Sequence, residues 1–218
     1  MTSREDILNK LRSSTKQAFP PTQSAPEKYL PVTQMGEDSL VSRFTAELER
    51  LSGKVYVVEG TQSVIDAVMQ IVGEDSSVLA WDNPLIPSLY EALSWKDISV
   101  IAAKVRGNDR AGTLQTLASI RVGITGADAA FAATGTLAMV AEKRQARIPS
   151  LLPPVHVVLL PRDRLYPTME EWLKQAGSQT LLNSRSLTFI TGPSRTSDIE
   201  MQIILGVHGP REIHVIIY

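Results

Sequence analysis

The residue types best suited to bind an anion follow an apolar run near the end of the chain. Leu187–Thr191 is typical of a buried strand, and Gly192 and Pro193 come directly after it as turn formers. The side chains that follow could donate hydrogen bonds to a carboxylate or a phosphate. They are the hydroxyls of Ser194, Thr196 and Ser197 and the guanidinium of Arg195. This loop is therefore the first candidate for a ligand contact.

The same segment predicts the start of a helix. Ser197 and Glu200 have the spacing of a capping box. A helix that begins there would turn its positive N-terminal end towards a bound anion, at the carboxyl end of a strand, where ligands gather in parallel sheets. The alternative is that these residues cap a helix and bind nothing.

A second candidate is the turn made by Thr134, Gly135 and Thr136, which follows the small-residue segment 126–133. Small side chains let a backbone or a ligand approach closely, and the two hydroxyls would add hydrogen bonds. A plain turn is the competing interpretation. Asp128 is a nearby carboxylate, and if it begins a helix after residue 126 it is a cap rather than an acid or base.

Other chemistry lacks its sequence signature. The chain contains neither a Gly-x-Ser-x-Gly elbow, nor a Walker loop, nor a Gly-x-Gly-x-x-Gly fingerprint. His156 and His214 fall in or beside predicted strands, which favours a structural role, and His208 falls in a turn expected to end a helix. Since none of the three is paired at ligand spacing, we do not expect a metal site.

Composition excludes several partners. The 22 basic and 23 acidic residues are scattered and give a formal charge of -1, so we do not expect a nucleic-acid surface. With no cysteine, this chain offers no disulfide, thiolate nucleophile or cysteine ligand for iron–sulfur clusters. No apolar run approaches the roughly 20 residues of a membrane span, and the polar start does not resemble a signal peptide, so we expect a cytoplasmic protein.

The elements that must position these residues alternate along the chain. Short apolar strands separated by helices predict an α/β fold, with a Rossmann-like, mostly parallel sheet and helices on both faces. The expected domains are an N-terminal helix with a proline-rich arm, 1–36, and an α/β domain, 37–218. We expect helices at 3–16, 38–52, 63–72, 84–93 and 113–120. Strands are expected at 55–58, 78–81, 98–102, 121–125, 137–141, 155–160, 187–191 and 213–218.

Four motifs resemble those of the LUD-domain family, also called DUF162. They are GITGAD at 123–128, ATGTL at 133–137, ITGPSRTSDIE at 190–200 and GVHGP at 206–210. The resemblance implies a fold like that of the NagB, ribose-5-phosphate isomerase and CoA-transferase group. It also implies a part in lactate utilization, the oxidation of L-lactate to pyruvate, beside one subunit that carries iron–sulfur clusters and another that is rich in cysteine.

The resemblance therefore implies a non-redox accessory subunit that binds a small anionic ligand and holds no cofactor itself. Alternatives are a stand-alone enzyme of the same fold that acts on a sugar phosphate or CoA ester, and a binding module without chemistry. The family commonly has Glu where Ala133 stands, and a glutamate is the nucleophile in the related CoA-transferases, so acyl transfer at this turn is in doubt. From the family to this chain we therefore carry over only the positions within the four motifs, and we expect them to contact a ligand.

Overall fold

The computed structural model describes residues 3–14, 36–81, 85–103, 110–141, 146–177, 180, 184, 186–197 and 203–218. The chain divides into two units, residues 1–33 and 34–218. The first contains α1 (Ser3–Ser14), where the sequence predicts a helix. The predicted proline-rich arm lies outside the described residues. No helix in the described part of the chain has the length and apolar character needed to cross a membrane.

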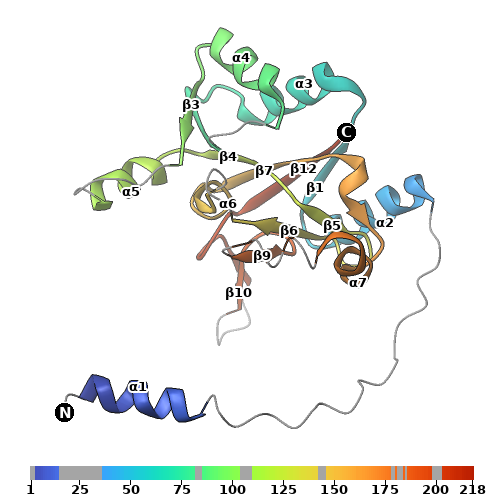
Figure 1. Ribbon diagram of the computed structural model, residues 1–218. Helices are drawn as coiled ribbons and strands as arrows, with labels where there is room; N and C mark the ends of the chain where they lie inside the picture. Colours follow the sequence, from blue (N-terminus) through green and yellow to red (C-terminus); the bar gives the residue numbers. More distant parts are fainter. Residues whose placement is uncertain are drawn as a thin grey trace. The chain divides into compact units, whose positions relative to one another are not determined.

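A six-stranded sheet forms the centre of the second unit (Figure 1). Its order is β1-β12-β7-β4-β2-β3, and every neighbouring pair is parallel. The inner strands are almost entirely apolar because both faces of the sheet are covered. The strands are β1 (Lys54–Val57), β2 (Ser77–Ala80), β3 (Ser99–Ala102), β4 (Val122–Gly126), β7 (Val155–Leu160) and β12 (Glu212–Ile217).

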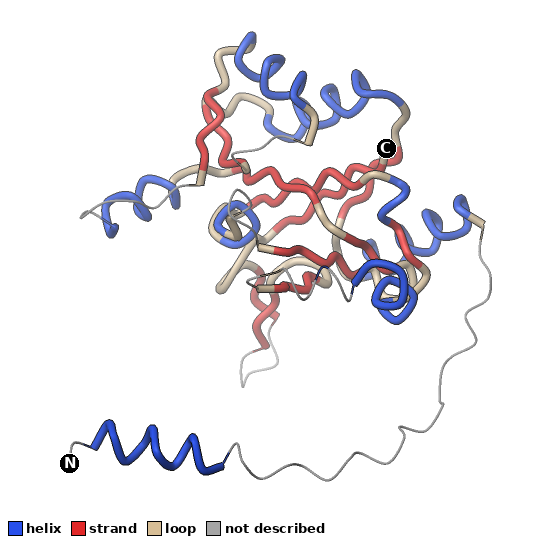
Figure 2. Tube along the Cα trace, in the orientation of Figure 1, coloured by secondary structure: helices blue, strands red, loops and turns tan. Residues whose placement is uncertain are grey.

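Helices pack on both faces of this sheet. On one face, α3 (Gly60–Val72) and α4 (Pro87–Trp95) bury their apolar sides against β2, β4 and β7. The opposite face is covered by α2 (Glu37–Arg50), α5 (Arg110–Ala118), α6 (Ile148–Leu151) and a second sheet. Figure 2 shows the strands of the two sheets in separate layers. The predicted α/β fold with a mostly parallel sheet and helices on both faces is confirmed.

The second sheet corrects two predictions. The runs expected at 137–141 and 187–191 do not join the parallel sheet, and no helix follows Gly126. Leu137 faces the parallel sheet while Ala138 faces Trp172, so β6 is buried on both sides and resembles a parallel strand in sequence. The strands, in the order β8-β5-β6-β9, are β5 (Ala129–Phe131), β6 (Thr136–Val140), β8 (Leu165–Tyr166) and β9 (Leu187–Ile190).

The prediction of a helix that begins at Ser197 is also wrong. Strands β10 (Arg195–Ser197) and β11 (Ile203–Leu205) pair in antiparallel register, with Thr196 opposite Ile204. These β-branched residues favour a strand, and this outweighs the local capping pattern. Since His208 follows a strand, there is no helix end for it to approach. The remaining short elements are η1 (Arg162–Arg164), α7 (Met169–Trp172) and the π-helical turn η2 (Leu173–Gly177).

Candidate functional site

Three threonine hydroxyls meet where the two predicted segments come together. Thr134 Oγ1 donates to Thr136 Oγ1 at 2.8 Å, and Thr136 Oγ1 lies 2.9 Å from Thr191 Oγ1. The pairing of β6 with β9 places them there, because Leu137 lies opposite Ile190. Thr134 and Thr191 are exposed and Thr136 is buried. The three residues are called the hydroxyl cluster below.

Two glycines beside the hydroxyl cluster pack closely against the end of α2. Gly135 has φ +63° and Gly192 has φ +84°, a left-handed conformation that favours glycine. A Cβ on Gly135 would lie 2.7 Å from the backbone nitrogen of Leu48, and one on Gly192 would lie 3.0 Å from Leu51 Cβ. These glycines therefore have a structural reason to be present, whether or not a ligand binds.

Replacing Gly135 with alanine should lower the free energy of unfolding by about 2 kcal/mol, because the new methyl group meets helix backbone at a strained φ. Urea unfolding would measure the change. Gly36→Ala is the matched control, since Gly36 has φ -65° and a Cβ there meets nothing within 4 Å. Equal effects of the two substitutions would contradict the close packing of the turn on α2.

The guanidinium of Arg195 also lies at the end of α2. It donates to the carbonyl of Leu51, and at 3.1 Å to Ser52 Oγ. The C-terminus of a helix carries partial negative charge, so a cation there is favourable. An anion that binds at the hydroxyl cluster would compete with the helix end for this side chain.

Backbone hydrogen bonds fix the loop between β9 and β10. The amide of Ser194 donates to the carbonyl of Pro210 at 2.9 Å, and the amide of Gly206 donates to the carbonyl of Ser194 at 2.9 Å. Pro193 is buried, and Thr196 and Ser197 lie in β10. The Gly192–Ser194 loop thus rests on the 206–210 turn. Glu200, the remaining predicted contact in this segment, lies outside the described residues.

Asp128 lies at the other end of the β5–β6 hairpin from the hydroxyl cluster. Its carboxylate accepts a hydrogen bond from the amide of Val140 at 2.7 Å, and its own amide donates to the carbonyl of Ala138 at 2.9 Å. It therefore closes the open end of a hairpin and does not cap a helix, which corrects that interpretation. The predicted ligand residues thus lie at two separate places.

His156 is fully buried in β7. Its Nε2 lies 2.8 Å from Thr125 Oγ1, while its Nδ1 has no partner among the residues that the structure describes. Burial lowers the pKa of His156 to about 3. The ring is therefore neutral near pH 7 and is held inside the sheet layer. This position is consistent with the structural role that the sequence favours for His156.

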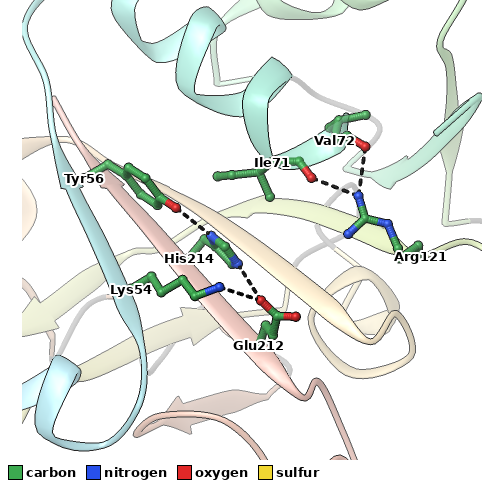
Figure 3. A network of polar contacts seen from close by, with 7 residues as sticks. All are labelled: Lys54, Tyr56, Ile71, Val72, Arg121, Glu212 and His214. Carbon is green, nitrogen blue, oxygen red and sulfur yellow. Dashed lines mark hydrogen bonds and ion pairs between the residues drawn. The ribbon is translucent and has the colours of Figure 1, made fainter. Parts of the chain in front are cut away.

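A second polar network joins the edge strand β1 to β12 (Figure 3). The Tyr56 hydroxyl lies 3.2 Å from His214 Nδ1, and His214 Nε2 lies 3.2 Å from Glu212 Oε2. Lys54 Nζ donates to the same Glu212 oxygen at 2.7 Å. An ionised Glu212 only accepts, so a neutral His214 carries its proton on Nε2 and Tyr56 donates to Nδ1.

The pKa values within this network follow from its contacts. Burial lowers the pKa of His214, against the opposing effect of the bond to Glu212. The hydrogen bond from Lys54 lowers the pKa of Glu212, and the same bond raises that of Lys54. All three residues lie at the amino ends of β1 and β12. The carboxyl ends, where ligands usually bind, are at the opposite edge of the sheet.

Arg121, just before β4, completes the polar contacts drawn in Figure 3. Its Nη2 donates to the carbonyls of Ile71 and Val72, each at 2.8 Å, and its Nε donates to Asp75 at 2.6 Å. The guanidinium thus satisfies carbonyls at the C-terminal end of α3. Sequence reasoning missed this contact, because no local pattern links residues so far apart. Among the described residues, no three acidic or histidine side chains gather closely enough to hold a metal ion.

The six-stranded parallel sheet and the smaller four-stranded sheet together form one α/β domain. Residues 41–218 match the model of the LUD domain, and the chain belongs to the LUD-domain family. A DUF162 family protein from Deinococcus radiodurans has a similar fold, with a TM-score of 0.65 and 19% identity, over 84% of this chain and 98% of that protein.

Several curated relatives are named lactate utilization protein C. The one from Exiguobacterium is 34% identical over 66% of this chain and 58% of its own length. The one from Macrococcus caseolyticus is 28% identical over 69% of this chain and 65% of its own length. The chain thus spans about three fifths of the length of these two relatives. An uncharacterized protein of Neisseria meningitidis is 28% identical over 99% of this chain and 93% of its own length.

Proposed function

We propose that this chain is a subunit of an L-lactate utilization system, in which lactate is oxidised to pyruvate. The observation that carries the proposal is its similarity to lactate utilization protein C, at 34% identity in Exiguobacterium. Membership of the LUD-domain family over residues 41–218 is consistent with it.

The proposed role is a non-redox one. This sequence has no cysteine, so it has no thiolate to bind an iron–sulfur cluster. The electrons of lactate oxidation would pass to clusters in a partner subunit, and a cysteine-rich subunit would complete the assembly. This chain would hold no cofactor of its own.

The proposed ligand is a small anion near the hydroxyl cluster. Two of its residues, Thr134 and Thr191, are exposed, and the guanidinium of Arg195 lies at the same end of α2. Together they offer the neutral and charged donors that a carboxylate needs. The proposed contacts are Thr134, Gly135, Thr136, Gly192, Pro193, Ser194, Arg195, Thr196, Ser197 and Glu200. Asp128, at the other end of the β5–β6 hairpin, is too far away to contact the same small anion.

Deletion of the gene in its native host would test the role. We expect growth on L-lactate as sole carbon source to fail while growth on pyruvate continues, because the step that is lost is the oxidation of lactate to pyruvate. A tagged chain should co-purify with a cluster-bearing protein. Normal growth of the deletion strain on lactate, without a co-purifying cluster protein, would exclude the proposal.

Substitution of Arg195 by glutamine tests the proposed anion site separately. If the guanidinium pairs with the ligand, the variant should fail to restore growth on lactate although it folds and retains its partners. Arg50→Gln is a matched control, because Arg50 is an exposed arginine near the same helix end that pairs with Glu47. Full complementation by both variants would exclude Arg195 as a ligand contact.

A further inference from the structure

Strand β1 forms one edge of the parallel sheet, and one side of its backbone is unpaired. The amide of Val58 donates to the carbonyl of Ile217, so the even-numbered residues of β1 turn their backbone groups towards β12. The alternate residues, Val55 and Val57, turn theirs away from it. Within the described residues no donor or acceptor pairs with the backbone groups of these two. An unpaired edge of this kind is a template for a strand of another chain.

The charged residue of β1 does not protect this edge. Natural edge strands often carry a lysine whose charge discourages pairing. Lys54, however, turns back over the sheet, where its Nζ lies 2.7 Å from Glu212 Oε2 in β12 (Figure 3). Tyr56 points the same way, towards His214. The free edge is therefore without a charged side chain from β1.

The side chains of β1 resemble those of an inner strand. Residues 55–58 are all apolar or aromatic, a pattern typical of strands that are buried on both faces. None of the four is fully buried, and Val57 is 47% exposed. In β3, at the other edge of the sheet, no large apolar side chain is exposed. A second strand beside β1 would cover Val57.

The two ends of β1 differ in charge. Glu59 follows the carboxyl end as the N-cap of α3, and its side chain is exposed, without a hydrogen bond or ion pair in the part of the chain that the structure describes. The amino end has two positive charges, Lys54 and the guanidinium of Arg195, which donates to Ser52 Oγ. Glu212 balances one of them. Antiparallel pairing of two β1 strands would bring opposite charges together, whereas parallel pairing would bring like charges together.

We propose that β1 is the contact between two copies of this chain, paired in antiparallel direction about a two-fold axis. Val55 of each copy lies opposite Val57 of the second copy, so that their free amides and carbonyls bond to one another. Glu59 of each copy then lies beside the Lys54 end of the other. A two-fold contact closes the assembly at a dimer, in which the two parallel sheets become continuous. This contact does not depend on the proposed part in lactate utilization.

Sedimentation of the full chain over a range of concentrations tests the dimer. The unaltered chain should change from monomer to dimer as its concentration rises. Val57→Lys should raise the dissociation constant of the dimer at least about tenfold, because an ammonium group would have to leave water at the contact. Val207→Lys places the same charge at another exposed valine and should leave the constant unchanged. A chain that stays monomeric at every concentration, or equal losses in both variants, would overturn the proposal.

Glu59→Lys tests the antiparallel direction, and it serves if Val57→Lys unfolds. Reversal of this charge should weaken the dimer roughly fivefold at low salt, and less at high salt, where surface charges are screened. Glu170→Lys is the matched control, because Glu170 is also an exposed glutamate in the first turn of a helix. Equal affinities of the two variants at low salt would exclude the antiparallel arrangement.

Amide hydrogen exchange identifies the strand that pairs. The amides of Val55 and Val57 should exchange quickly in the monomer and at least about tenfold more slowly in the dimer, because they gain acceptors there. Val100 and Ala102 are the matched controls. Their amides point away from β2 at the other edge of the sheet, and their exchange should not depend on concentration. A dimer in which Val55 and Val57 exchange as fast as in the monomer would show that another surface holds the two copies.

Discussion

Replacing Gly123 with alanine is expected to lower the free energy of unfolding by at least about 4 kcal/mol, or to prevent folding. Gly123 is buried in the middle of β4. A Cβ there would overlap the carbonyl oxygen of Pro149 and would lie 2.9 Å from both the carbonyl carbon of Pro149 and Pro153 Cγ. Because these atoms belong to backbone and a proline ring, α6 would have to move away from the sheet. Urea unfolding measures the loss.

Gly126→Ala is the matched control for this prediction. It lies in the same buried strand, but its Cβ would meet chiefly the end of the Leu85 side chain, which can turn aside. We expect a loss of about 1 kcal/mol or less there. Similar losses for the two alanine variants would show that α6 does not rest on Gly123.

Acidification should destabilise the protein through His156. Its pKa is about 3 in the folded chain against 6.5 for the free side chain, so below pH 6.5 the unfolded state binds a proton that the folded state does not. The stability contributed by the neutral ring is complete above pH 6.5 and is lost as the pH falls towards 3. At pH 4 the loss from this residue should be about 3 kcal/mol relative to pH 7.

His156→Gln should remove this part of the acid sensitivity. Glutamine can still hydrogen-bond to Thr125 but has no proton to gain, so stability should fall less steeply between pH 7 and pH 4 than in the unaltered chain. His208→Gln, at an exposed position, should keep the original slope. Urea unfolding at each pH gives the comparison. If the slopes of the three proteins are the same, a buried neutral His156 is not the cause.

Much of the parallel sheet could be predicted from local sequence. β7 forms at 155–160, as expected from its apolar run, and the other parallel strands lie within one or two residues of their predicted ranges. A strand covered on both faces has few polar residues, and this signal is independent of its neighbours. β6 has the same signal for a different reason. One of its faces packs on the parallel sheet, and the other packs on Trp172 of α7. Apolar runs therefore identify strands without assigning them to a sheet.

The candidate site was less predictable because its partners are distant in sequence. The Thr134–Thr136 turn and the segment after β9 were predicted as separate candidates, and the contact between Thr136 and Thr191 shows that they lie together. The engagement of Arg195 with α2 was not expected, since Leu51 is 144 residues away.

The place of β12 in the sheet has a consequence for folding. This strand lies between β1 and β7, and its Glu212 reaches Lys54 across 158 residues of sequence. Until β12 has been synthesised, β1 has no neighbour in the parallel sheet, and the edge of β7 that will pair with it is open. Closing so long a loop costs conformational entropy before the contact is formed, which slows folding. A ribosome-bound chain that lacks β12 therefore presents two unpaired strand edges, and both are covered in the same step when that strand enters.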